Sequence, residues 1–161
     1  MNEHKKDILL IITQMESEIG RSAMQSLFDS SGNATGEKKV GCNQFREIAN
    51  DCRIADCYEE ILLLLRYTEA KSKNGVSWKT KCSNNKTFGE IVIANMSKVR
   101  SFANQNDWDT VKELLQMYFG YLYWQSRVWA DQQTGTQRDG NGNRPNFKNG
   151  NKSNSNRNNY R

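Results

Sequence analysis

The chain has few of the residues on which most catalytic and metal sites depend. Its 161 residues include one histidine, His4, close to the N-terminus. A hydrolytic triad needs a positioned base, and the sequence contains no P-loop, GxGxxG or HExxH motif. Its neighbouring carboxylates, Glu59-Glu60 and Asp107/Asp109, fit a solvated helix face and a helix start. The sequence therefore predicts a protein that is not an enzyme and uses no cofactor or metal.

Zinc-site and CxxC spacings are also missing from the four cysteines, at positions 42, 52, 57 and 82. We expect Cys52 to pack in the core. The apolar run at 8–12 is too short for a signal peptide, and no segment has the length of a membrane span. These features predict a cytoplasmic protein with reduced thiols and no membrane contact.

Residues 131–161 lack Val, Ile, Leu, Met, Trp and Cys and contain nine asparagines. Such a segment cannot bury enough apolar surface to offset its ordering entropy, so we predict a disordered basic tail after a folded domain of residues 1–130. The tail has six basic and two acidic residues, which accounts for most of the net charge of +5. Its spaced charges are typical of RNA-binding tails, and a solubilising end would have the same composition.

The folded part contains no proline, because Pro145 lies in the tail. Apolar residues recur at helical spacing and strand patterns are absent, which predicts an all-α, compact bundle of four to five helices. The predicted helices cover about 2–28, 43–70 (as one helix or two), 87–102 and 107–129. We expect Asn43 to cap the second helix, and Thr87 with Glu90 to form a capping box.

The segment Lys71–Thr87, which we call the lysine loop, contains five lysines and no acidic residue around Trp78. Ammonium groups beside an indole suit a sugar-phosphate backbone with a base stacked on the ring. A solvated loop with Trp78 turned back onto the bundle explains the same composition. The candidate RNA-binding residues of the loop are Lys71, Lys73, Lys79, Lys81 and Trp78.

Aromatic residues cover more than one face of the last predicted helix. Part of this set fits the core, and the remainder indicates a protein–protein contact, because Tyr and Trp are frequent interface anchors. The candidate contact residues are Tyr121, Tyr123, Trp124 and Trp129.

The segment VGCNQFREIAND at 40–51 resembles the motif that opens a helix in small subunits of type III-A CRISPR effector complexes. Gln44 and Arg46 are its best matches. LLLLRYTEAKSKNG at 62–75 and MYFGYLYW at 117–124 are similar to later elements of that family, so the resemblance covers about residues 40–130. Lys71 stands where the family has an arginine soon after the tyrosine, and the N-terminal helix and Asn-rich tail are additional. A type III-B or III-D small subunit therefore also fits.

The resemblance implies a non-catalytic helical bundle that stacks in several copies and lines the guide/target RNA channel of a ribonucleoprotein. Its partners would be guide RNA, target RNA, other CRISPR effector subunits and further copies of itself. Arg46 and Lys71 are then the RNA contacts carried over from the family. Two alternatives stay open: a stand-alone nucleic-acid-binding accessory protein, such as a helical bundle serving a reverse transcriptase, and a structural scaffold without nucleic acid.

Overall fold

A computed structural model of the chain describes residues 3–29, 38–104 and 106–137. These residues form six α-helices, two short 3-10 helices and one pair of two-residue strands. In chain order the elements are α1 (Lys5–Ile19), α2 (Arg21–Leu27), β1 (Phe28–Asp29), β2 (Val40–Gly41), α3 (Asn43–Ile54), α4 (Tyr58–Ala70), η1 (Ser77–Lys79), η2 (Ser83–Asn85), α5 (Phe88–Arg100) and α6 (Trp108–Gln137). The predicted helical fold class is confirmed.

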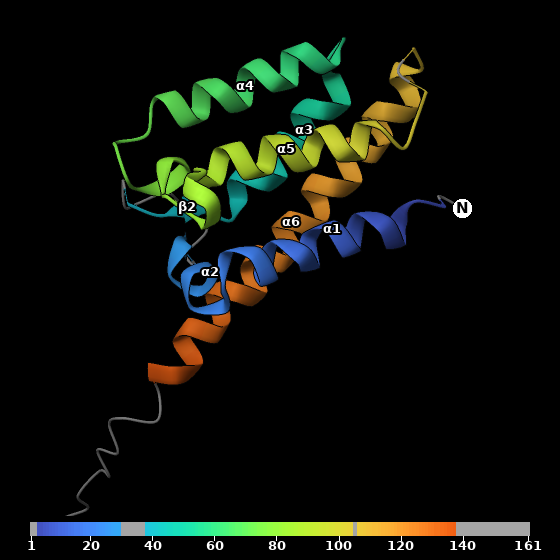
Figure 1. Ribbon diagram of the computed structural model, residues 1–161. Helices are drawn as coiled ribbons and strands as arrows, with labels where there is room; N and C mark the ends of the chain where they lie inside the picture. Colours follow the sequence, from blue (N-terminus) through green and yellow to red (C-terminus); the bar gives the residue numbers. More distant parts are fainter. Residues whose placement is uncertain (1–2, 30–37, 105, 138–161) are drawn as a thin grey trace, which may run out of the picture.

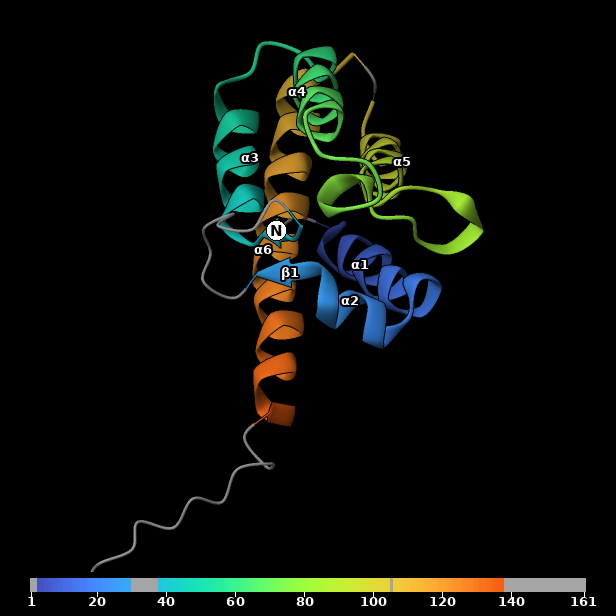
Figure 2. The same ribbon diagram turned by 90° about the vertical axis from the view of Figure 1, so that its left-hand side faces the viewer.

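The long helix α6 is the central element of the fold (Figure 1). Helices α3, α5, α2 and α1 all pack against it, with α3 on one side and α5 and α1 on the other (Figure 2). Its buried stripe is the one that the helical spacing predicts, and includes Val111, Leu114, Leu115, Tyr118, Phe119 and Leu122. No helix in the described ranges is long and apolar enough to cross a bilayer.

The N-terminal segment is two helices, and the prediction of one helix over 2–28 is wrong. Gly20 separates α1 from α2 with φ +94° and ψ 140°. Residues that carry a side chain rarely adopt this backbone conformation. Its N–H donates to the Glu16 carbonyl oxygen (2.9 Å), and its own carbonyl accepts from Met24 N–H (3.0 Å). The glycine thus ends one helix and begins the next.

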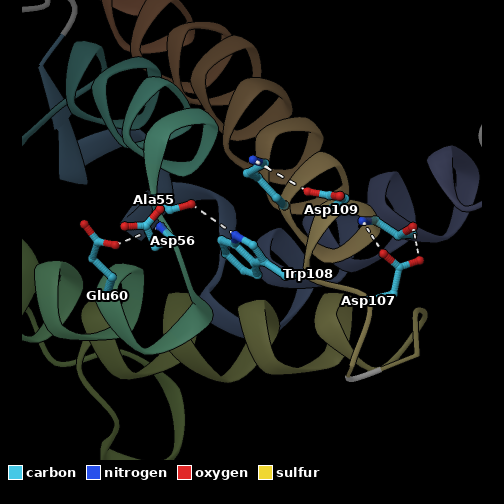
Figure 3. Close-up of polar contacts among 8 residues, drawn as sticks. Ala55, Asp56, Glu60, Asp107, Trp108 and Asp109 are labelled. Atoms are coloured by element: carbon cyan, nitrogen blue, oxygen red, sulfur yellow. Dashed lines mark hydrogen bonds and ion pairs between the residues drawn. The ribbon is translucent and has the colours of Figure 1, made fainter.

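The segment 43–70 is two helices, which was one of the two possibilities left open. The break falls at Ala55, whose backbone is extended and whose side chain is buried. The indole N–H of Trp108 donates to the Ala55 carbonyl oxygen (3.0 Å), which fixes the break against the start of α6 (Figure 3). Glu60 accepts from Asp56 N–H (2.9 Å) and holds the connection to α4.

The predicted capping box at α5 is confirmed: Thr87 Oγ1 accepts from Glu90 N–H, and Glu90 Oε2 accepts from Thr87 N–H. The prediction that Asn43 caps its helix is wrong. Asn43 is already the first residue of α3, and Cys42 before it has helical backbone angles and makes no side-chain cap. The helix therefore starts without the cap that an Asn at this boundary favours.

The end of α6 also differs from the prediction. The helix continues to Gln137, so the predicted boundary at residue 131 falls inside it. The predicted disorder of residues 138–161 lies outside the described part of the chain. The expected absence of strands is corrected by one short parallel pair, in which Phe28 is opposite Val40 and Asp29 is opposite Gly41.

An aromatic cluster joins this strand pair to the helices. Phe28 stacks on Trp129 (5.5 Å between ring centroids) and meets Phe45 and Phe88 edge-on. Trp78 packs against Phe45 and Phe88 at 5.7 and 5.3 Å. All five rings are 1% exposed or less, so they form the centre of the core.

Candidate nucleic-acid interface

A groove of about 370 Å³ lies on the surface where the N-terminal end of α1, α3 and α6 meet. We call it the basic-aromatic groove, because cations and aromatic rings dominate its lining. The lining residues are Lys5, Arg46, Ala49, Asn50, Met117, Gly120, Tyr121, Tyr123 and Trp124. No acidic residue is among them.

Two ring contacts organise the groove. The Arg46 guanidinium lies 5.3 Å from the centroid of the Tyr123 ring, a distance typical of a cation–π contact. The rings of Tyr121 and Trp124 lie 5.8 Å apart with an interplanar angle of 54°. The Trp124 side chain is 67% exposed, so most of its indole surface is in contact with solvent.

Helix geometry explains why these side chains meet. Arg46, Ala49 and Asn50 are spaced by three and four residues and share one face of α3. Met117, Gly120, Tyr121 and Trp124 have the same spacing on α6. The two helices pack closely along their length, with Phe45, Ile48 and Cys52 buried on the neighbouring face of α3. The groove thus follows from the rigid contact between α3 and α6.

The structure joins two sets of residues that the sequence assigns to different partners. Arg46 is a predicted RNA contact, and Tyr121, Tyr123 and Trp124 are predicted protein contacts, yet all four line one groove. The predicted RNA-binding lysines of the lysine loop do not line it. Lys71 lies over Tyr67 (5.4 Å to the ring centroid), Lys79 donates to the Ala70 carbonyl oxygen, and Lys81 donates to the Asn85 carbonyl oxygen.

Trp78 is not available for stacking, so its predicted role as an RNA contact is wrong. Its side chain is 1% exposed, and both neighbouring aromatic rings belong to the core. Its indole N–H donates to Gln44 Oε1 over 2.7 Å, which satisfies the one polar atom of the ring. The alternative, in which Trp78 turns back onto the bundle, is the arrangement found. Lys73 is exposed at the turn before it.

The predicted protein contact at Trp129 is wrong for the same physical reason. This residue is 1% exposed, stacks on Phe28, and donates its indole N–H to Glu16 Oε2 (3.2 Å). It fixes α6 to α1 and β1. Of the aromatic residues predicted as contacts, Trp124 is exposed, and Tyr121 and Tyr123 are partly exposed.

The paired carboxylates have structural roles in the helix ends (Figure 3). Asp107 accepts hydrogen bonds from Thr110 N–H and Oγ1–H, which begins α6 and lowers the pKa of the Asp107 carboxyl. Asp109 lies 3.9 Å from Lys112 Nζ. No cluster of three or more potential metal ligands occurs among the described residues.

All four cysteines are free thiols, and Cys42 and Cys52 are fully buried. Core packing of Cys52 is as predicted. Burial raises the pKa of Cys52 to about 12 and also raises the pKa of Cys42 and Cys82. These three thiols stay protonated at neutral pH, which makes them poor nucleophiles and poor metal ligands.

Sequence reasoning missed Lys5, Asn50 and Met117 as groove residues. Lys5 lies on α1, more than 100 residues from Tyr121, and only the packing of the bundle brings it to the groove. Asn50 could have been found from its position four residues after Arg46 on the same predicted helix. Comparison with protein families, with characterised proteins and with solved structures finds no match to this chain.

Proposed function

We propose that this chain is a non-catalytic RNA-binding protein and that the basic-aromatic groove is its RNA contact. We further propose that it serves as a small subunit of a type III CRISPR-like ribonucleoprotein, present in several copies with guide and target RNA. The RNA contact is supported by the groove, and the assembly is supported by the sequence resemblance at residues 40–130.

The observation that carries the RNA contact is the position of Arg46. It lies in the segment that resembles the CRISPR small subunits, and it extends over Tyr123 at the edge of a groove with an exposed indole. A guanidinium suits phosphate oxygens because its donors form a planar fork. Lys5 adds a second positive charge to the lining.

The aromatic part of the groove supports single-stranded rather than double-stranded RNA. Unpaired bases stack on aromatic side chains, and each such contact is worth about 1–3 kcal/mol. Trp124 presents the largest exposed ring, and Tyr121 beside it enlarges the surface. A base on Trp124 with its phosphate directed to Arg46 and Lys5 uses both parts of the groove. Asn50 offers an amide NH₂ donor group and a carbonyl oxygen acceptor for a base edge or a ribose hydroxyl.

The fluorescence of Trp124 provides the test. The four tryptophans differ in environment: Trp78 and Trp129 are buried, Trp108 is partly buried, and Trp124 is 67% exposed. Titration with a single-stranded oligoribonucleotide should therefore quench the solvent-exposed component of the emission. Quenching should weaken as the salt concentration rises, because phosphate contacts release counterions. The Trp124→Phe variant should retain binding but lose this signal.

Charge-reversal variants distinguish RNA binding in the basic-aromatic groove from general attraction of RNA to the rest of the surface. Arg46→Glu should weaken RNA binding roughly tenfold or more, and Arg66→Glu on α4 is the matched control with the same change in net charge. Trp124→Leu should weaken binding at every salt concentration because it removes stacking. Equal loss in the two charge variants would show that general electrostatics, and not the groove, attracts the RNA.

The proposed membership of a ribonucleoprotein is tested separately from the proposed RNA contact. A subunit of a ribonucleoprotein should bind RNA weakly alone and strongly when the other subunits and a guide RNA are present. A stand-alone accessory protein should bind tightly alone with a steep salt dependence. The absence of detectable RNA binding in both situations would contradict the proposed function. The remaining alternative would then be a structural scaffold without nucleic acid.

A protein-docking role for the same helix face is the second candidate. Val128 is 49% exposed and lies one helical turn beyond Trp124, so apolar surface continues along α6 past the groove. Val128→Glu should leave RNA binding by the isolated chain unchanged and reduce incorporation into a complex. If it weakens RNA binding as much as Trp124→Leu, the apolar face is part of the RNA contact.

A further inference from the structure

Helix α4 has an exposed face that no other described element covers. The helix runs along the upper edge of the bundle in both views and packs against α5 and η1 on its inner side (Figure 1, Figure 2). Its buried residues form the inner stripe and are Tyr58, Ile61, Leu65 and Thr68. The exposed residues recur at helical spacing on the opposite face, which we call the outer face of α4, and are Glu59, Glu60, Leu63, Arg66, Tyr67 and Ala70.

The middle of this outer face is apolar. Leu63 is 68% exposed, and Tyr67, one helical turn later, is 61% exposed. Leu63 lies in a run of aliphatic residues over 61–65, so the centre of α4 is apolar on nearly every side. A helix with this pattern is normally covered on more than one side, and the bundle covers only the inner one. Exposed leucines are common on their own, so the charges around this pair decide what it contacts.

Charged side chains flank the apolar middle along both edges of the outer face. Residues about seven positions apart lie two helical turns apart on the same side of a helix. Glu59 and Arg66 therefore share one edge, and Glu60 and Tyr67 share the other, with Leu63 between them. The Lys71 ammonium lies 5.4 Å from the centroid of the Tyr67 ring, which places a cation on the second edge. Each edge thus has an acid toward the start of α4 and a cation toward its end.

Contacts within one copy leave most of the bonding capacity of these charged groups unused. Glu59 Oε1 lies 3.9 Å from Arg100 of α5, which is a long distance for an ion pair. Glu60 uses one carboxylate oxygen, Oε2, to accept from Asp56 N–H. Arg66 forms no ion pair within the described residues. The outer face of α4 therefore keeps both acceptors and donors for a partner.

We propose that the outer face of α4 pairs with the same face of a second copy of this chain in a twofold, antiparallel contact. A twofold axis at the level of Leu63 brings the two copies of this side chain together. Each edge then faces the same edge of the second copy with its direction reversed. Glu59 stands opposite Arg66 of the second copy, and Glu60 stands opposite Tyr67 and Lys71 of the second copy. Every acid meets a cation, whereas a parallel pair would bring the acids of both copies together at one end.

This pair is closed after two copies, so it is separate from the repeated stacking proposed for the ribonucleoprotein and does not depend on RNA binding. One helix from each copy forms a small interface, roughly 1,200 Å² or less in total, at the low end for specific contacts. We therefore expect a reversible dimer with a Kd on the order of 10–100 µM. Well below this concentration the chain is monomeric, and Arg66→Glu remains a valid control for RNA binding in the basic-aromatic groove.

Sedimentation velocity of the full chain without RNA, from about 1 µM to about 1 mM protein, tests the pair. The unaltered chain should change from monomer to dimer over this range. Leu63→Glu places two carboxylates at the twofold axis and should raise the dimer Kd by about tenfold or more. Leu10→Glu, the same change at an exposed leucine of α1, is the matched control and should dimerise as the unaltered chain does. Both positions are exposed, so both variants should keep the helical circular dichroism signal.

Charge exchange tests the antiparallel arrangement. Glu59→Arg places a cation opposite Arg66 of the second copy, and Arg66→Glu places an acid opposite Glu59 of the second copy. Each single variant should weaken the dimer roughly threefold to tenfold, and the double variant should restore it because opposite charges face each other again. The proposal is overturned if the chain stays monomeric at the highest concentration, even where another protein covers α4. It is also overturned if Leu63→Glu and Leu10→Glu dimerise equally, or if the double variant is no stronger than the single variants.

Discussion

The lysine loop and the aromatic end of α6 each place a tryptophan close to basic residues, and the fold treats the two in opposite ways. Trp78 of the loop is buried between Phe45 and Phe88, with its N–H bonded to Gln44. Trp124 of α6 is 67% exposed beside a groove with Arg46 on its edge. The sequence neighbourhood of an indole therefore does not decide its burial: the N–H of Trp78 has a partner 34 positions away in the chain, and that long-range contact accompanies its place in the core.

The largest expected difference between these two regions is in stability. Trp78→Ala should lower the free energy of unfolding by about 3–5 kcal/mol, because it leaves a cavity among the core rings. Trp124→Ala should change it by less than about 0.5 kcal/mol, as is usual for exposed positions. Denaturant unfolding of both variants measures the contrast. Similar losses in the two variants would mean that Trp124 is part of the packed structure and not a free ring.

The helical architecture could be predicted because it depends on local signals. Periodic apolar residues located the helices, and Thr87 with Glu90 marked one start to the residue. Gly20 was harder, since a glycine near the end of a helical pattern is compatible with both continuation and a break. Its positive φ lies at the junction of two helices that pack against each other, and no local pattern specifies that arrangement.

The candidate site was less predictable because long-range contacts decide it. Whether Trp78 faces solvent depends on Gln44, 34 positions earlier in the chain. Lys5 reaches the basic-aromatic groove only through the packing of α1 in the bundle. Composition pointed to cations beside aromatic rings in the lysine loop, whereas the structure gathers such residues from α1, α3 and α6 around the basic-aromatic groove.

Removing the Gln44–Trp78 hydrogen bond tests directly what keeps Trp78 buried while Trp124 is exposed. Gln44→Leu keeps the side-chain size but leaves the buried indole N–H unpaired, which should cost about 1–3 kcal/mol of folding free energy. Gln14→Leu, at an exposed position of α1, is the control and should have little effect. Thermal and denaturant unfolding of the two variants measure these changes in folding free energy. An unchanged stability for Gln44→Leu would show that water or another acceptor replaces the glutamine.

Asn95 provides the inverse case, a buried polar side chain whose Nδ2 has no partner of good hydrogen-bond geometry among the described residues. Asn95→Leu removes this unpaired donor and should raise the free energy of unfolding by about 1 kcal/mol. The neighbouring Tyr118 hydroxyl has its pKa raised by burial and lowered by interaction with Asn95. A fall in stability would therefore indicate that Asn95 forms a hydrogen bond with Tyr118. Calorimetry of Asn95→Leu and Tyr118→Phe together distinguishes the two situations, because a shared hydrogen bond makes their effects non-additive.

The smallest effect is expected at the fully exposed start of α6, where Asp107 accepts two hydrogen bonds from Thr110. These bonds lower the pKa of the Asp107 carboxyl below its usual value of 3.8. Its contribution to stability is therefore present above the unfolded-state pKa and is lost as the pH falls through the folded-state pKa. Asp107→Asn should lower the Tm slightly near neutral pH, and the difference from the unaltered chain should shrink below about pH 4. A Tm difference that persists at lower pH would mean that Asp107 stabilises α6 through its shape as an N-cap and not through its charge.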